Sequence, residues 1–305
     1  MQRSSKNKSD PINCSSAVII DAKYKSWFIF PAFGIQILLL LGSLVMAATT
    51  RETTAWLGAA IATLGLPIIF AQLTLRPAPR TSENLPLLLF VTAVGVLVAG
   101  WEQFIVEASG WAPTIVALVA GAIFLLYVFW YSRFGRFDSS SLMVGGKLPE
   151  FSLSDLAGNS FNSSSLAGSP AAIIFYRGNW CPLCMAQIRE IADRYQDMAA
   201  MGIKVLLISP QSDDHSRELA ERFAAPMTFL VDEGNQVAEQ LGLAVRNGVP
   251  IGMPGNYAPD SVMPTVVVTN ANGTILFSDQ TDNYRLRPEP DMFLAILRRA
   301  GVTAK

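Results

Sequence analysis

Two cysteines, Cys181 and Cys184, lie three positions apart in the segment Phe-Tyr-Arg-Gly-Asn-Trp-Cys-Pro-Leu-Cys over residues 175–184. An apolar run over residues 171–176 precedes them, and a helical pattern follows. Cys181 is therefore expected at a helix N-terminus, where unpaired N–H groups and the helix dipole stabilise a thiolate. Cys-x-x-Cys sites lower the thiol pKa from about 8.5 to about 3.5–7.5. Cys184 is close enough to resolve a sulfenic acid or mixed disulfide on Cys181, so the spacing predicts thiol redox chemistry.

The elements around the cysteines alternate between strand and helix. Residues 171–176 and 203–208 are typical of buried strands, and the helix between them gives a βαβ unit with a parallel pair. The later elements are, in order, a helix capped at Ser212–Asp214, a strand over 227–231, a short helix over 237–241, a strand over 265–269, a turn at 272–273, a strand over 274–278 and a helix over 290–299. This is the thioredoxin order, an α/β fold with a central mixed sheet flanked by helices.

Pro264 directly precedes the strand over residues 265–269, a place where proline is disfavoured. In thioredoxin-fold proteins a cis-proline occupies this place, close to the Cys-x-x-Cys. Met263, Pro264 and Thr265 would then expose a backbone edge on which a substrate thiol or disulfide docks. We therefore expect a cis peptide bond before Pro264 and a substrate-positioning role for the three residues.

From Lys147 to about Leu297 the sequence resembles the peroxiredoxin-like branch of the alkyl hydroperoxide reductase/thiol-specific antioxidant family. The matching text is the segment over residues 175–184, Ile-Ser-Pro-Gln at 208–211 and Asn-Tyr-Arg-Leu-Arg-Pro-Glu-Pro at 283–290. The resemblance implies a thioredoxin fold and thiol-dependent antioxidant or oxidoreductase activity. It also implies a peroxide or disulfide as substrate and a thioredoxin- or glutaredoxin-like protein as electron donor.

Two positions depart from the family pattern. Typical peroxiredoxins carry a threonine three residues before the peroxidatic cysteine, whereas this sequence has Gly178 there. They also place an arginine just before the late central strand, near the position that Met263 holds. Both groups that orient a peroxide are therefore missing, and Arg177, Arg285 or Arg287 is the candidate to substitute for them.

The resulting interpretation is an enzyme in which Cys181 attacks a peroxide or a disulfide and Cys184 resolves the product. Trp180 is expected to pack beside the site, with Arg177 as a substrate-positioning group, and Pro182 to help set the spacing and the pKa. The choice between peroxide and protein disulfide stays open. Two alternatives remain, a redox sensor without turnover and a transporter with an accessory redox domain.

Other classes of site find little support. Zinc needs four ligands, and beyond the pair the chain offers only Cys14 and His215, so no metal site and no cofactor are expected. His215 lies beside Asp213, Asp214 and Ser216, which is typical of a solvated surface and argues against a hydrolase triad. A net charge of −1 argues against nucleic acid as a partner.

The first half of the chain is strongly apolar. Charged residues make up 15% of the whole chain, against roughly 25% in ordinary globular domains, and the deficit falls in the first half. Bilayer spans need about 20 apolar residues. Four segments qualify: Trp27–Ala48, Thr54–Leu75, Leu85–Phe104 and Ala112–Tyr131. Tryptophans near their ends fit an aromatic belt, and Glu102 is expected at the interface beside Trp101. We predict an all-α transmembrane domain of four helices in contact with a lipid bilayer.

Basic residues concentrate in the N-terminal tail, in the second loop and after the fourth segment, whereas the opposite side carries only Arg51. The positive-inside rule then predicts a plasma (inner) membrane protein whose termini and redox domain are cytoplasmic. The spans lack Cys and His, which indicates an anchor or a docking platform. The predicted organisation is a disordered basic tail over 1–26, a transmembrane region over 27–131, a linker over 132–146 and a thioredoxin-like domain over 147–305.

Overall fold

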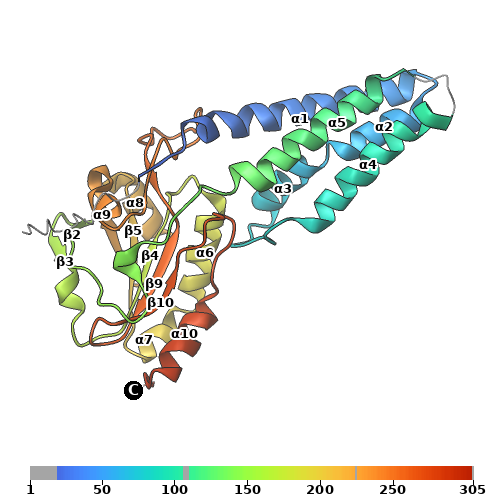
Figure 1. Cartoon of the computed structure of the whole chain (residues 1–305). Helices are drawn as coiled ribbons and strands as arrows, with labels where there is room; N and C mark the ends of the chain where they lie inside the picture. The colour runs from blue at the N-terminus through green and yellow to red at the C-terminus, as the bar shows by residue number, and fades with distance from the viewer. Residues whose placement is uncertain (1–18, 106–109, 224, 304–305) are drawn as a thin grey trace, which may run out of the picture.

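The computed structural model of the 305-residue chain describes residues 19–105, 110–223 and 225–303. A helical bundle extends from one end of a domain built around a sheet (Figure 1). Most of the expected disordered tail, including Cys14, lies outside the described residues. From Ile20 onward the chain is ordered against the sheet domain, because strand β1 (Ile20–Asp21) pairs in parallel with β7 (Ala244–Arg246).

The bundle contains the apolar helices of the first half. Its elements are α1 (Lys23–Thr49), α2 (Thr53–Ala62), α3 (Gly65–Leu75), α4 (Pro86–Ile105), α5 (Ala112–Leu126) and the π-helical turn η1 (Tyr127–Tyr131). Within the described residues, α1 and the continuous helix Ala112–Tyr131 are long and apolar enough to cross a membrane. The pair α2 and α3 adds a third span if it is counted as one, and the apolar part of α4, Pro86–Trp101, is shorter. The predicted count of four spans thus stays a prediction.

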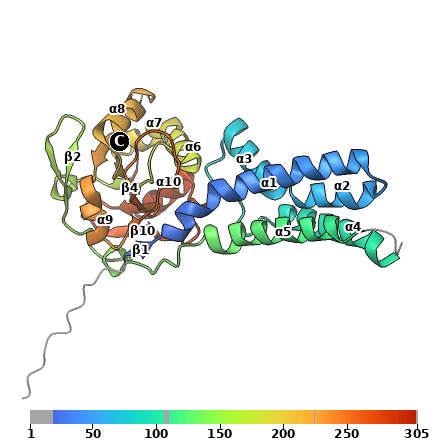
Figure 2. The same ribbon diagram turned by 90° about the horizontal axis from the view of Figure 1, so that it is seen from above.

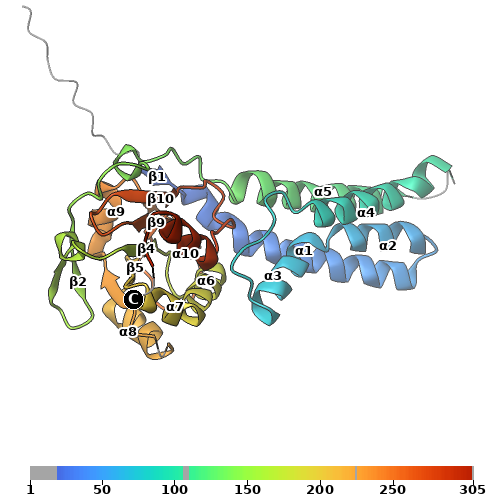
Figure 3. The same ribbon diagram turned by 90° about the horizontal axis from the view of Figure 1, so that it is seen from below.

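The segment Thr54–Leu75, predicted as one helix, is broken and bends by 50° between α2 and α3. Pro67 has no N–H to donate to the carbonyl of Thr63, and Gly65 adds backbone freedom next to it. Beyond the bend, α3 diverges from the other helices toward the sheet domain (Figures 2 and 3). The bend therefore brings α3 toward the sheet domain.

Two glycines let α2 and α4 approach until their backbones touch. A Cβ atom at Gly58 would lie 2.4 Å from the backbone nitrogen of Ala99, and one at Gly95 would lie 2.4 Å from that of Ala62. Small residues at such crossings are typical of helices that pack inside membranes. The position of α4 in the bundle thus depends on the absence of two side chains.

We expect the substitution Gly95→Leu to destabilise the bundle, because overpacking of a close contact costs about 1–3 kcal/mol or more. The measurement is the thermal midpoint of the full chain in detergent. Gly42→Leu is the matched control, since no atom lies within 4 Å of a Cβ at Gly42. Equal midpoints for the two variants would contradict the close packing of α2 on α4.

The sheet domain has seven strands in the order β10-β9-β4-β5-β6-β2-β3. The strands are β2 (Ser152–Asp155), β3 (Ser160–Asn162), β4 (Ala171–Phe175), β5 (Lys204–Ser209), β6 (Thr228–Val231), β9 (Thr265–Thr269) and β10 (Ile275–Asp279). The central strands β4, β5 and β6 are parallel, and β9 and β10 continue the sheet in antiparallel pairing. This topology with its flanking helices is the thioredoxin-like fold that the sequence predicts.

Side chains alternate between the two faces of the sheet and build two cores. Ile174 and Leu207 belong to the core under α6 (Pro182–Asp193), and Ile173 and Leu206 to the core on the opposite face. The other helices are α7 (Tyr195–Ala200), α8 (Asp213–Glu221), α9 (Gln236–Gln240) and α10 (Pro290–Arg299). Short segments complete the fold: η2 (Ser140–Leu142), η3 (Ser163–Leu166), η4 (Glu233–Asn235) and β8 (Ser261–Val262). The single helix expected between the strands over 171–176 and 203–208 is divided at Arg194 into α6 and α7.

The bundle and the sheet domain share one hydrophobic core. Residues of the bundle such as Ile69, Phe124 and Tyr131 belong to the same buried cluster as Cys181 and Leu183. The junction is also tied by the fully buried Arg285, whose guanidinium donates to Ser132 Oγ at 2.8 Å, Thr81 Oγ1 at 2.6 Å and the Glu83 carbonyl at 2.7 Å. The bundle therefore packs firmly against the face of the domain that carries the cysteines.

Candidate active site

Cys181 and Cys184 lie together at the N-terminus of α6. Cys181 is the N-cap residue, and Pro182 occupies the first turn, where its missing N–H costs nothing. The Cys181 Sγ atom accepts a hydrogen bond from the backbone nitrogen of Cys184 at 3.4 Å. Both thiols are free. The placement at a helix N-terminus follows the sequence prediction, and the two sulfur atoms are neighbours.

Two of the three candidate arginines are beside the thiols. Arg287 Nη2 lies 3.5 Å from Cys184 Sγ, and its Nε donates to the Tyr284 carbonyl at 3.0 Å. The guanidinium of Arg177 lies 4.5 Å from the ring centroid of Trp180 and 5.2 Å from that of Tyr284. Arg285 is turned instead toward the junction with the bundle. The positive charge at the site thus comes from Arg177 and Arg287.

The thiols are electrostatically coupled. Burial and the hydrogen bond with Cys184 raise the pKa of Cys181 well above its ordinary value. Burial also raises the pKa of Cys184, but the hydrogen bond from Cys181 and the charge of Arg287 outweigh it and lower this pKa to about 5. The pair accordingly shares one proton and one negative charge at neutral pH. The sequence predicted a low pKa at Cys181, but burial and the hydrogen bond with Cys184 raise the pKa of Cys181, and the hydrogen bond from Cys181 together with Arg287 lowers the pKa of Cys184 instead.

Neither sulfur atom faces bulk water. Cys181 is 2% exposed and Cys184 is fully buried. Tyr127 and Tyr131 of η1 and Ile69 of α3 belong to the same buried cluster as Cys181. Residues of the bundle therefore contribute to the burial of the site.

A cavity of about 290 Å³ lies at the junction and reaches Cys181. It is lined by Ile29 and Phe30 of α1, Phe70, Leu73 and Thr74 of α3, Tyr127 and Tyr131 of η1, Arg177, Trp180, Cys181, Pro182, Leu183, Pro250, Met253, Pro254 and Tyr284. Cys184 is not among these residues. Cys181 is thus the thiol that a ligand in the cavity would meet.

The predicted docking edge at Met263, Pro264 and Thr265 is not exposed. All three residues are buried, and Arg136 covers them by donating to the Pro264 carbonyl at 3.3 Å and to Thr265 Oγ1 at 2.9 Å. The expected cis-proline is also wrong, because no cis peptide bond occurs among the described residues. A trans proline is compatible with its place just before β9, where β-strands tolerate it best. These residues do not line the cavity at Cys181.

The backbone conformation at position 178 requires a glycine. Its φ of +139° is one that side-chain-bearing residues rarely adopt, and a Cβ atom there would lie 2.7 Å from Trp180 Nε1. The following residue, Asn179, donates its backbone N–H to Gln211 Oε1 at 2.8 Å, which fixes the loop between β4 and α6. The threonine that typical peroxiredoxins carry at this position therefore does not fit the loop as it packs against Trp180.

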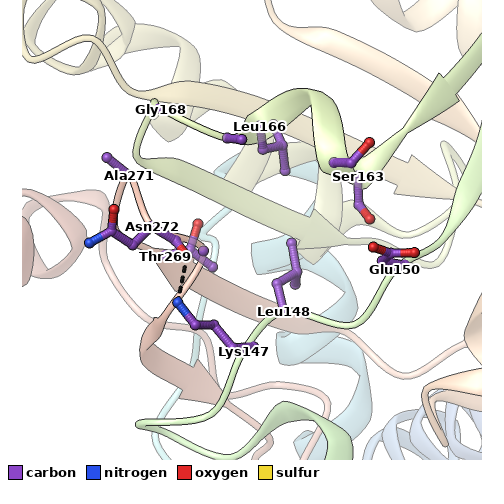
Figure 4. A pocket seen from close by; sticks show the side chains of 12 residues that line it. Lys147, Leu148, Glu150, Ser163, Leu166, Gly168, Thr269, Ala271 and Asn272 are labelled. Carbon is purple, nitrogen blue, oxygen red and sulfur yellow. Dashed lines mark hydrogen bonds between the residues drawn. The ribbon is translucent and has the colours of Figure 1, made fainter.

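His215 takes no part in the site. Its ring stacks on Tyr257 with centroids 4.2 Å apart, and its Nδ1 lies 3.0 Å from Ser212 Oγ. Within the described residues, no group of three or more His, Cys, Asp or Glu side chains could hold a metal ion. A separate hollow of about 500 Å³ is lined by Lys147, Glu150 and backbone turns, and Figure 4 shows the Lys147 amine donating to the Asn272 carbonyl at 2.8 Å. Because its lining contains no thiol, we assign no chemistry to this hollow.

Residues 144–278 match the family model described as AhpC/TSA family. This region is an AhpC/TSA domain. It contains both cysteines, and the match supports a peroxiredoxin-like protein of the thioredoxin superfamily. The bundle and the segment with Tyr284 and Arg287 lie outside the matched residues.

Curated relatives of the AhpC/TSA domain are peroxiredoxins. "Peroxiredoxin Q, chloroplastic" of Sedum lineare is 31% identical over 99 residues, which is 32% of this chain and 53% of that protein. "Peroxiredoxin Bcp" of Escherichia coli (strain K12) is 31% identical over 102 residues, 33% of this chain and 65% of that protein. The chain spans about half the length of the curated relatives that it first matches. Among solved structures, peroxidoxin BcpB of Mycobacterium tuberculosis shares 23% identity over 52% of this chain and 97% of its own, with a TM-score of 0.43.

Sequence reasoning missed most of the cavity wall. Tyr284 belongs to the motif over residues 283–290, so the sequence contained a signal for it. Only Arg285 and Arg287 of this motif were predicted to act at the site. The lining residues from α1, α3 and η1 carried no signal, since nothing in an apolar helix indicates which face meets a distant domain. Their role at the AhpC/TSA domain emerges only from the packing of the bundle.

Proposed function

We propose that the protein is a membrane-anchored, thiol-dependent peroxidase of peroxiredoxin type that acts through Cys181 and Cys184. One observation carries the proposal: two free thiols lie together at the N-terminus of α6, with the Arg287 guanidinium 3.5 Å from Cys184 Sγ. The AhpC/TSA domain and the peroxiredoxin names of its relatives support a hydroperoxide as the oxidant.

In the resting pair Cys184 is the thiolate and Cys181 holds the proton. In the first step this proton moves from Cys181 to Cys184, which leaves Cys181 as the thiolate. Cys181 Sγ attacks the terminal oxygen of the hydroperoxide, the O–O bond breaks, and Cys181 becomes a sulfenic acid. The alkoxide that leaves takes the proton from Cys184 and departs as the alcohol. Cys181 is the attacking atom because it lines the cavity, and Cys184 serves as the proton donor because Arg287 stabilises the thiolate that remains.

In the second step the Cys184 thiolate attacks the sulfur of the Cys181 sulfenic acid. The S–O bond breaks, hydroxide leaves and is protonated to water, and an S–S bond joins the two residues. A dithiol donor of the thioredoxin or glutaredoxin class then reduces this disulfide and is itself oxidised. In each turnover the thiol pair gives two electrons to the hydroperoxide, and the dithiol donor gives two electrons back to the resulting disulfide.

A second candidate is a thioredoxin-like disulfide reductase, or a sensor that is oxidised without turnover. The absence of a threonine at Gly178 and of an arginine at Met263 favours it, since both groups would orient an O–O bond. Against a protein disulfide stands the burial of the edge at Met263, Pro264 and Thr265 beneath Arg136. The peroxidase interpretation is therefore preferred.

The membrane position is part of the proposal. The apolar lengths of α1 and of Ala112–Tyr131 support it. The start of α1 at Lys23, the segment with Arg80 after α3 and the end of the bundle at Arg133 all adjoin the sheet domain. The connection between α1 and α2, which contains Arg51, lies at the far end of the bundle (Figure 1). We infer a cytoplasmic redox domain over 147–305, joined by the segment 132–146 to a transmembrane region over 27–131.

The test is a single-turnover reaction of the full chain in detergent, without a reductant. We expect one equivalent of an alkyl hydroperoxide to yield one equivalent of alcohol and a disulfide between Cys181 and Cys184, identified by mass spectrometry of the peptides. A parallel sample receives a model disulfide in place of the hydroperoxide. Oxidation by the disulfide alone would reject the peroxidase and favour the disulfide reductase.

A further inference from the structure

The cavity at Cys181 is built jointly by the two halves of the chain. The bundle contributes Phe30 of α1 together with Phe70 and Leu73 of α3, and the redox domain contributes Trp180 and Cys181. The AhpC/TSA match begins only at residue 144, so the bundle side of this wall is an addition to that domain. The thiol thus faces a surface that belongs to apolar helices.

The wall is suited to a hydrocarbon chain. The side chains that the bundle contributes are aliphatic or aromatic, apart from Thr74 and the tyrosine hydroxyl groups. The volume of about 290 Å³ is near the lower end of small-molecule sites, roughly 300–1,000 Å³, and so accommodates part of an acyl chain rather than a whole lipid. A small polar oxidant gains nothing from such a surface, because it must leave water to enter.

The cavity also lies at the depth where a membrane lipid would present its upper acyl chain. Trp27 and Trp130 are exposed at the end of the bundle near the redox domain, and Trp101 and Trp111 are exposed at the far end. Exposed tryptophans mark the interface of a bilayer. Phe30 follows Trp27 by one turn of α1, which puts it about 4–5 Å deeper along the helix axis.

The lining of the cavity includes exposed residues from both halves of the chain. Beyond the 50° bend α3 leaves the bundle, and Thr74 near its end lines the cavity and is exposed, as is Pro254 of the sheet domain. Phe33 of α1 and Phe70 of α3 stack with centroids 4.3 Å apart, and Phe70 also lines the cavity. The proposed entrance for a ligand is therefore between Thr74 and Pro254.

We propose that this cavity binds the acyl chain of a lipid hydroperoxide that enters from the membrane, and that Phe30, Phe70 and Leu73 make the enzyme prefer lipid hydroperoxides to hydrogen peroxide. The inference rests on the proposed function and names the substrate class of the same site. The chemistry is unchanged: the lipid hydroperoxide becomes the lipid alcohol, and Cys181 and Cys184 become the disulfide that a dithiol donor reduces.

The test uses the full chain in lipid nanodiscs with a dithiol reductant and compares kcat/KM for a phosphatidylcholine hydroperoxide with that for hydrogen peroxide. We expect a ratio well above ten in favour of the lipid, since a pocket built for apolar groups discriminates by about 10–200-fold for each group it can bury. Leu73→Trp fills the cavity and is expected to lower this ratio at least about tenfold, mainly through the KM of the lipid.

The matched control is Leu87→Trp, because Leu87 is 72% exposed on α4 and does not line the cavity. We expect it to keep the wild-type ratio. Phe70→Ala is the second variant, for use if Leu73→Trp fails to fold. It enlarges the cavity and removes an aromatic ring from its wall, so we expect it also to lower the ratio of kcat/KM values.

Equal kcat/KM for the two peroxides in the wild type would overturn the inference, as would equal effects of the cavity variants and Leu87→Trp. In either case turnover of hydrogen peroxide would leave the proposed function intact. If neither peroxide oxidises the cysteines, the proposed function fails together with the inference. Oxidation of Cys181 and Cys184 by a lipid quinone in nanodiscs, without any reaction with either peroxide, would likewise mean that the proposed function and the inference both fail.

Discussion

Replacing Cys181 with serine is expected to lower hydroperoxide turnover by at least about a thousandfold, because a serine hydroxyl is not ionised near neutral pH and is a far weaker nucleophile than a thiolate. Cys181 is also the thiol that lines the cavity, whereas Cys184 lies behind it. The measurement is steady-state peroxide consumption by the full chain with a dithiol donor. Cys14→Ser is the matched control, and we expect it to keep wild-type turnover.

The companion variant Cys184→Ser separates the two steps. Without Cys184 the sulfenic acid on Cys181 has no partner, so one equivalent of hydroperoxide is consumed and turnover then stops. A dimedone-type probe should label Cys181 in this variant. The roles would be reversed if Cys181→Ser still formed a labelled sulfenic acid and Cys184→Ser did not. That outcome is a real alternative, since the lowered pKa of about 5 belongs to Cys184.

Removing the charge of Arg287 is expected to produce the second largest effect. Arg287 Nη2 is 3.5 Å from Cys184 Sγ, and this charge is one of the causes that hold the pKa of the pair low. An opposite charge at such a distance lowers a pKa by about 1–3 units. In Arg287→Met the first ionisation of the pair should therefore move up from about 5 by that amount, so that reactivity at pH 6 falls roughly two- to hundredfold.

The sign of the pH dependence follows from the same contact. The pKa is lowered in the folded protein, so the thiolate is present at neutral pH and is lost as the pH falls through about 5. The rate of alkylation by iodoacetamide against pH measures this midpoint. Arg287→Lys should restore most of the wild-type profile because it keeps the charge, and Arg299→Met, at an exposed position of α10, should not shift it. An unchanged midpoint in Arg287→Met would show that another group, such as Arg177, sets the pKa.

The sequence determined the fold of the sheet domain and the place of the two candidate cysteines at a helix N-terminus. The apolar runs at β4 and β5, the turn at Asn272–Gly273 and the spacing of Cys181 and Cys184 are local signals, and the structure follows each of them. Local patterns work here because a buried parallel strand and a helix N-terminus leave their marks within a few consecutive residues. The same holds for the long apolar helices α1 and α5.

The tertiary structure decided which charged group lies beside the thiols and which residues form the cavity that reaches Cys181. Arg287 is about a hundred residues from Cys184 in the chain, and only the packing of the segment before α10 brings the two together. The sequence predicted a docking edge at Pro264, but Arg136 of the segment 132–146 donates a hydrogen bond to the Pro264 carbonyl and covers this edge. The apolar wall opposite Cys181 comes from α1, α3 and η1, whose sequences specify apolar surface but not its partner. Contacts of this kind depend on shape and burial across distant segments, and no local pattern encodes them.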